Sequence, residues 1–246
     1  MEFKIPTETV ELPSKGLLYP EGHPLRSGTV EMKYMTAKEE DILTNQNYIK
    51  NGTVIEKLLK SLIISEVDFS DFLVADIDAI MVAARILSYG KDYEFAYDGE
   101  KQQVDLSAIE AKSYPPENLD LSTNEFTFKL PHSGNEVTFK LLTQGDDKEI
   151  QRELQGLRKI NKDNYAEGST RLKYILTSVN GGRDRADIRR FVDNYLLAKD
   201  ARALREEYSR VSPGMDMKVN VETSNGLEEE VDIPIDITFF WPDATV

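Results

Sequence analysis

Two runs of alternating apolar residues near the middle of the chain constrain its fold more than any other feature. They occupy positions 126–130 and 137–141, and every second residue in each run is large and apolar. Successive side chains on a strand point to opposite faces, so each run predicts one apolar face. The four-residue segment Pro131–Gly134 suits a hairpin loop that pairs Phe126 with Phe139. Loop length and apolar pattern therefore agree on one antiparallel register.

A second hairpin is predicted around Asp98-Gly99, a dipeptide typical of two-residue turns between strands. The segment that follows this turn, Gly99–Leu106, has a distant echo in Gly226–Ile233. Both segments read glycine, four mostly polar residues, Val-Asp and an aliphatic residue. A match this short is weak by itself, but it suggests that two similar hairpins lie far apart in the chain.

The C-terminal hairpin turns near Asn225-Gly226. We predict a three-residue loop, Asn225–Leu227, because it pairs Val219 with Ile233 and keeps the apolar residues on one face. Continued alternation predicts a strand up to Pro242, with Phe239 buried and Phe240 facing outward. Trp241 would then point back toward the core side.

Segments with helical periodicity separate these hairpins, and the chain is therefore predicted to be an α+β protein. Capping boxes at Thr36/Glu39 and Thr53/Glu56 begin two helices, and Gly90 ends a third. A second helical block is expected to begin at Asp146 and to contain a helix through 172–179.

The chain is predicted to comprise an arm, two structured regions and a linker. The predicted units are an extended N-terminal arm (1–35), a helical region that ends in a hairpin (36–106), a linker (107–125), and a hairpin, helical block and C-terminal hairpin (126–246). Prolines and glycines punctuate the arm, so we expect it to be an interaction element outside the core.

Composition argues against several classes of function. The net charge of −14 opposes binding to nucleic acid, and no apolar run approaches the roughly 20 residues that span a bilayer. The chain has no cysteine and no secretory leader pattern, which suits a reducing cytoplasm. A basic cluster over 183–205 is interleaved with carboxylates, a pattern typical of ion pairs on helix surfaces.

No enzyme template fits the sequence. It lacks a cysteine nucleophile, a Walker loop and a dinucleotide fingerprint, and its two histidines, His23 and His132, fall in the arm and in a hairpin turn. The aspartates at 68, 71, 76 and 78 lack calcium-loop spacing, so we expect them to solvate helix ends. The prediction is a protein that is not an enzyme and has no cofactor, metal or small-molecule substrate.

Motifs along most of the chain resemble those of the T4-type phage baseplate hub proteins and hub assembly factors. The matching segments are Pro13–Tyr19, Tyr89-Gly90, Leu141–Thr143 with Gly145-Asp146, Phe191–Asp193, Val231–Pro234 and Phe239–Pro242. The resemblance implies a structural or assembly role in a contractile-tail baseplate hub. Its partners would be other hub and tail proteins, with the tape-measure or spike complex among the candidates.

The same resemblance bears on the two echoed hairpins. Many relatives carry Cys-x-x-Cys-Gly knuckles at such turns, and two knuckles would supply four thiolates to a zinc ion. Here the knuckle positions hold Phe95 and Asp98, and Glu222 and Asn225, none of which is a thiolate. The resemblance therefore implies a degenerate, metal-free zinc-ribbon-like pair of hairpins in which apolar packing replaces the metal.

Large apolar residues beside prolines at both ends of the chain suit either a core or a docking surface. On the docking interpretation, the partner-binding residues are Lys15, Gly16, Leu17, Leu18, Tyr19, Phe240 and Trp241. The protein would act in the host cytoplasm during assembly and, if incorporated, in the tail baseplate of the virion. Two alternatives stay open: a transient tail assembly chaperone that is absent from the mature virion, and a nucleic-acid-binding regulator.

Overall fold

The computed structural model of the protein describes residues 4–116, 119, 121, 123–160 and 166–240. Small antiparallel sheets lie beside two groups of helices, which confirms the predicted α+β class. Among the described residues, no helix is both long enough and apolar enough to cross a membrane.

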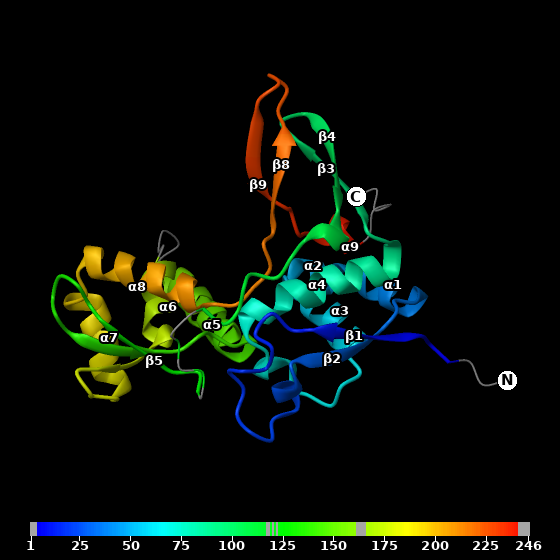
Figure 1. Cartoon of the computed structure of the whole chain (residues 1–246). Helices are drawn as coiled ribbons and strands as arrows, with labels where there is room; N and C mark the ends of the chain where they lie inside the picture. Colours follow the sequence, from blue (N-terminus) through cyan, green and yellow to red (C-terminus); the bar gives the residue numbers. More distant parts are fainter. Residues whose placement is uncertain (1–3, 117–118, 120, 122, 161–165, 241–246) are drawn as a thin grey trace.

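The N-terminal body holds a two-stranded sheet and the first group of helices. Its elements are β1 (Thr7–Glu11), η1 (Pro24–Ser27), β2 (Thr29–Lys33), α1 (Ala37–Leu43), α2 (Gln46–Lys50), α3 (Val54–Leu62), η2 (Phe69–Asp71) and α4 (Val74–Tyr89). β1 and β2 pair antiparallel, with Val10 opposite Val30. The sheet and α3 pack around α4 (Figure 1).

One of the two predicted capping boxes in this body is formed. Thr36 Oγ1 and the Thr36 amide both donate to the Glu39 carboxylate, at 2.7 and 3.0 Å. Lys33 and Ser61 also donate to Glu39. Burial alone would raise the pKa of Glu39, but these hydrogen bonds outweigh it and lower the pKa to about 2. The prediction for Thr53 was wrong, because its side chain makes no cap bond and Glu56 pairs with Lys60 instead.

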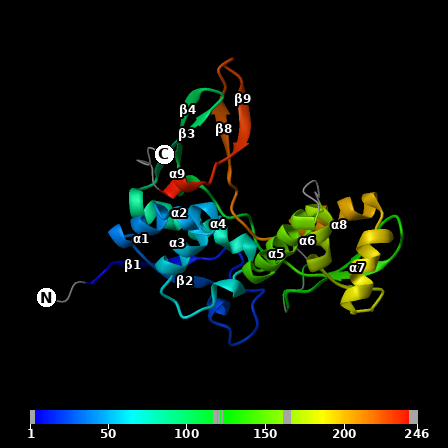
Figure 2. The same ribbon diagram turned by 180° about the vertical axis from the view of Figure 1, so that it is seen from behind.

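Two hairpins project together from the body, and we call them the paired hairpins (residues 91–105 and 216–236). Their elements, with the helices at their base, are β3 (Asp92–Tyr97), β4 (Glu100–Asp105), η3 (Leu106–Ala108), β8 (Lys218–Glu222), β9 (Glu228–Asp232) and α9 (Ile237–Phe240). Figures 1 and 2 show the paired hairpins rising above α4, with α9 at their base.

The turn of the first hairpin agrees with the sequence. Tyr97 pairs with Glu100, so Asp98 and Gly99 form a two-residue turn. Both have positive φ, 49° and 80°, as this turn requires.

The predicted register of the second hairpin was wrong. Val219 lies opposite Val231, not Ile233. The amide and the hydroxyl of Thr223 both donate to the Leu227 carbonyl, at 2.8 and 3.0 Å. These bonds close the three-residue loop Ser224–Gly226, one residue earlier than expected, and shift the register by two.

The helical block at the other end of the molecule contains a three-stranded sheet. Its elements are β5 (Phe126–Lys129), β6 (Glu136–Phe139), α5 (Gln144–Ile160), α6 (Glu167–Ile175), β7 (Leu176–Val179), α7 (Arg185–Asn194) and α8 (Ala198–Val211). The β5–β6 register is the predicted one, with Phe126 opposite Phe139 and their ring centroids 5.4 Å apart. A buried carboxylate, Asp200 of α8, accepts hydrogen bonds from the amides of His132 and Ser133 in the hairpin loop.

Two boundaries in this block differ from the prediction. The helix expected through 172–179 ends at Ile175, and Leu176–Val179 forms β7 on the edge of β6. Periodicity could not show this, because β7 gains its ladder partner from a strand about 40 residues away. α5 begins before Asp146, since Thr143 and Asp146 cap it reciprocally through their side chains and amides.

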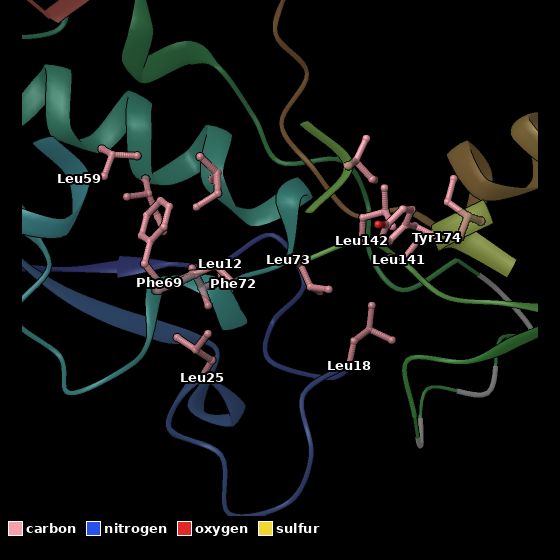
Figure 3. Packing of buried hydrophobic residues seen from close by; sticks show 14 of the residues in the cluster. Leu12, Leu18, Leu25, Leu59, Phe69, Phe72, Leu73, Leu141, Leu142 and Tyr174 are labelled. Carbon is pink, nitrogen blue, oxygen red and sulfur yellow. The ribbon is translucent and has the colours of Figure 1, made fainter. Parts of the chain in front are cut away.

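A continuous apolar core joins the body to the helical block. Leu73 and Thr143 form a β-bridge, and the Val74 amide donates to the Leu142 carbonyl at 2.9 Å. Figure 3 shows Leu73 between Phe72 on the body side and Leu141 and Leu142 on the other. Two segments connect the paired hairpins to the helical block, one after η3 and one after α8. They pair with each other through the Ala111–Met215 bridge.

Two expectations about the chain ends need correction. The N-terminal segment folds back on itself, because β1 pairs with β2, and its Leu12, Leu18 and Leu25 are buried in the main core, so it does not stand apart from the core. The predicted strand after Ile233 is replaced by α9, in which Phe239 and Phe240 are both fully buried. A helical turn lets adjacent residues face the same core, whereas a strand would separate them.

Candidate protein-interaction surfaces

The loop Pro13–Tyr19 is fixed to α4 by one buried carboxylate, Asp76. The amide and hydroxyl of Ser14 donate to Asp76 at 2.9 and 2.8 Å, and the Tyr19 hydroxyl donates at 2.7 Å. The Tyr19 oxygen also accepts a bond from the Leu73 amide at 2.9 Å. Burial raises the pKa of Asp76 despite these three donors. The expectation that Asp76 solvates a helix end was wrong, since it is 0% exposed.

Arg26 closes the loop from the other side. Its guanidinium donates to the carbonyls of Gly16, Leu17 and Tyr19. Gly16 has φ 73°, and a Cβ at that position would come within 2.5 Å of the Arg26 carbonyl oxygen. Only glycine allows the loop to approach so closely. Sequence reasoning missed the roles of Arg26 and Asp76. No local pattern links either residue to the loop, and Asp76 is distant from it in the chain.

Few of the predicted contact residues in this loop face solvent. Lys15 is exposed and Leu17 is partly buried, whereas Gly16, Leu18 and Tyr19 are buried. Lys15 has φ 52°, in the left-handed region that side-chain-bearing residues rarely adopt. The loop is therefore a rigid turn that presents the Lys15 ammonium to solvent.

The predicted contact residues at the C-terminus do not form a surface with this loop. Phe240 is fully buried and packs edge-on against Phe239, with ring centroids 5.1 Å apart. Tyr93 of β3 packs on the other side of Phe239 at 4.9 Å. Trp241 lies outside the described residues.

The paired hairpins meet at their turns, where the echoed motifs place their knuckle-like positions. The amide and hydroxyl of Ser224 donate to Asp98, at 3.1 and 2.6 Å, which lowers the pKa of that carboxyl. Gln102 Nε2 donates to the Glu222 carbonyl at 2.9 Å. Hydrogen bonds thus join the two tips, and Tyr93 of β3 and Val221 of β8 are buried. In the part of the chain that the structure describes, no group of side chains could hold a metal ion.

Much of the negative charge of the protein is concentrated on the paired hairpins. They carry twelve carboxylates and three lysines, a net charge of −9 out of −14. Two of these carboxylates, Asp105 and Glu230, form ion pairs within the hairpins, with Lys91 and Lys218. The remaining acidic groups make the surface of the paired hairpins strongly negative.

A polar groove runs between η2 and α3 on one side and the start of α5 on the other. Its volume is about 1250 Å³. Six carboxylates and three cations line it; Glu56 pairs with Lys60 and Lys148, and Asp147 pairs with Arg171 outside the groove. The groove is therefore a polar seam between the two helical groups, in which carboxylates outnumber cations.

The two histidines make structural contacts. His23 caps η1 by accepting a bond from the Leu25 amide, and its other ring nitrogen lies 3.3 Å from Asp71. His132 lies in the β5–β6 loop.

Comparison with protein families shows which class of protein this chain belongs to. A family model described as T4 bacteriophage base plate protein matches residues 5–241, nearly the whole chain. The chain belongs to this family of structural phage baseplate proteins. Searches of curated proteins and of solved structures find no match.

Proposed function

We propose that this baseplate protein acts in the hub, as a structural subunit or as a factor needed during hub assembly, through contacts with other hub and tail proteins. It would be made in the host cytoplasm and reside in the tail baseplate if incorporated. Membership of the baseplate family and the motif resemblance to hub proteins support this role.

The conformation of Lys15 is the observation that indicates which surface makes these contacts. A left-handed conformation costs a residue with a side chain about 1–2 kcal/mol, and glycine would avoid that cost. The rest of the loop is fixed by Asp76 and Arg26, so the backbone at Lys15 is held in one conformation. An exposed cation carried on a strained, rigid backbone is suited to recognition of an acidic group on a partner.

The remaining predicted contact residues fit this proposal in different ways. Leu17 flanks Lys15 and is partly accessible, while Gly16, Leu18 and Tyr19 support the loop from beneath. We assign direct contact to Lys15 and Leu17.

Two substitutions of Lys15 separate a binding role from a structural one. Lys15→Gly removes the charge and relieves the left-handed strain, so it should leave the melting temperature unchanged or slightly raised. Lys15→Glu reverses the charge. Both should reduce incorporation into hub complexes assembled in host cells that express the other baseplate proteins. Lys38→Glu is the matched control, since Lys38 is also exposed and makes no ion pair within the described residues.

Normal hub assembly with both Lys15 variants would refute the assignment of this loop as a contact. Mass spectrometry of purified virions would then distinguish a resident subunit from a transient chaperone, which would be absent from the particle. A salt-dependent shift of DNA by the purified protein would favour the regulator instead. In the cluster at 183–205, ion pairs hold Arg183, Arg189, Arg190 and Arg202, so these four cations are less available to DNA.

A further inference from the structure

The corner between α7 and α8 exposes apolar side chains at the far end of the helical block. Tyr195 follows the last residue of α7 and is 63% exposed, and Leu197 precedes α8 and is 50% exposed. Leu196 between them packs against the core. Two exposed apolar residues, one on each side of Leu196, give this corner a small apolar surface that has no partner among the described residues.

Two exposed cations follow this corner on α8. Residues 183–211 contain eight cations and six carboxylates, so the segment is net positive, in contrast to the chain as a whole. Lys199 and Arg205 on α8 are exposed and make no ion pair with any residue that the structure describes. One of the six carboxylates, Asp200, is buried and accepts hydrogen bonds from amides of the β5–β6 loop, so it does not offset the surface charge. The corner therefore combines apolar contact area with positive charge.

The tip of the second hairpin has the complementary character. Leu227 is 63% exposed at the end of the loop, and its backbone is held by Thr223. The cross-strand pair Glu222 and Glu228 lies directly beside it, and both side chains are exposed. An apolar side chain flanked by carboxylates on a projecting hairpin matches an apolar corner flanked by cations.

These two surfaces lie apart on one molecule. Figures 1 and 2 both show the paired hairpins rising from the body and the α7–α8 corner at the remote end of the helical block. We propose that the α7–α8 corner binds the β8–β9 tip of a second copy of this chain. The contact joins unlike surfaces head to tail, so it builds a closed ring or an open chain of subunits. This proposal does not rest on the hub role.

The expected contact is weak and sensitive to salt. Two small tips bury less than the roughly 1,200 Å² of a stable interface. Exposed charges are screened beyond about 8 Å at physiological ionic strength, so association should weaken as salt is added. Repetition of the contact around a ring would strengthen it by making the last closure intramolecular.

The absence of cysteine from the chain allows a direct test. Tyr195→Cys and Leu227→Cys are made in separate preparations of the full chain, mixed, and oxidised. The mixture should form the disulfide-linked heterodimer in excess over either homodimer, and added salt should reduce its yield. Ile49→Cys replaces Leu227→Cys in the control mixture, since Ile49 is 38% exposed but lies on α2. Equal yields from the two mixtures would overturn the proposal.

A charge swap tests the electrostatic part by sedimentation at several concentrations. The double variant Lys199→Glu/Arg205→Glu and the double variant Glu222→Lys/Glu228→Lys should each weaken self-association about tenfold, equivalent to about 1.4 kcal/mol. Mixing the two variants should restore association, because reversed charges again face each other. A wild-type chain that stays monomeric overturns the proposal. So does a corner variant that loses binding to another hub protein while self-association is unchanged.

Discussion

The Tyr19→Phe substitution removes one buried hydroxyl that makes two hydrogen bonds, to the Asp76 carboxylate and from the Leu73 amide. A hydrogen bond to a charged group contributes about 1.5–3 kcal/mol, and a buried amide left without a partner costs about 1–3 kcal/mol. We therefore expect the free energy of unfolding to fall by about 3–5 kcal/mol. That is a large share of the roughly 5–15 kcal/mol typical of a folded domain.

The effect should depend on pH in a defined direction. The pKa of Asp76 is raised in the folded protein, so its favourable contribution is complete at low pH and is lost as the pH rises through that value. Loss of the Tyr19 donor raises the pKa of Asp76 further, because that bond stabilises the carboxylate. The destabilisation by Tyr19→Phe should therefore be larger at pH 8 than at pH 5.

Urea unfolding followed by far-ultraviolet circular dichroism at both pH values measures the effect. Tyr34→Phe is the control, since the Tyr34 hydroxyl makes only a long, exposed bond of 3.4 Å to Glu8. It should unfold within about 0.5 kcal/mol of the wild type. If Tyr19→Phe does the same, or if its effect is larger at pH 5, then the loop is not held by Asp76 as we describe.

Three further predictions concern the core. Gly16→Ala should destabilise by about 2–5 kcal/mol, from backbone strain and overpacking, while Gly22→Ala, with φ 80° and open space around it, should cost only about 1–2 kcal/mol in urea unfolding. Glu39→Gln should destabilise at neutral pH, but the difference should narrow below about pH 4 in acid titration, because the stabilising contribution of a carboxyl with a pKa of about 2 is lost as the pH falls toward that value. Phe240→Ala should lower stability by about 3–5 kcal/mol in thermal unfolding, and near-wild-type melting would contradict its burial in α9.

Several features that depend on neighbouring residues were predicted correctly, although the capping box at Thr53 was not. The Asp98-Gly99 turn, the β5–β6 register and the end of α4 at Gly90 each follow from residues close in the chain. Turn conformation, strand alternation and helix capping act over a few residues, so the sequence carries their signal directly. The family resemblance of the motifs was likewise confirmed, over 5–241.

The C-terminal hairpin shows where local patterns stop being sufficient. Two registers put the same residues on the same face, and they differ only by two positions along the strand. Side-chain bonds from Thr223 to Leu227 select between them. The following segment reads equally well as a strand, but α9 forms because both Phe239 and Phe240 can then be buried, against Tyr93 among others.

By itself, the sequence determined the α+β class, the positions of most helices and hairpins, and the baseplate family. Tertiary structure alone decided which of its polar groups are buried. Asp76 lies 62 residues from Ser14, and their contact turns an apparent helix-end carboxylate into the anchor of the N-terminal loop. Burial and hydrogen bonding across such separations depend on which surfaces meet in the folded chain. The spacing of residues along the sequence does not show which surfaces will contact each other.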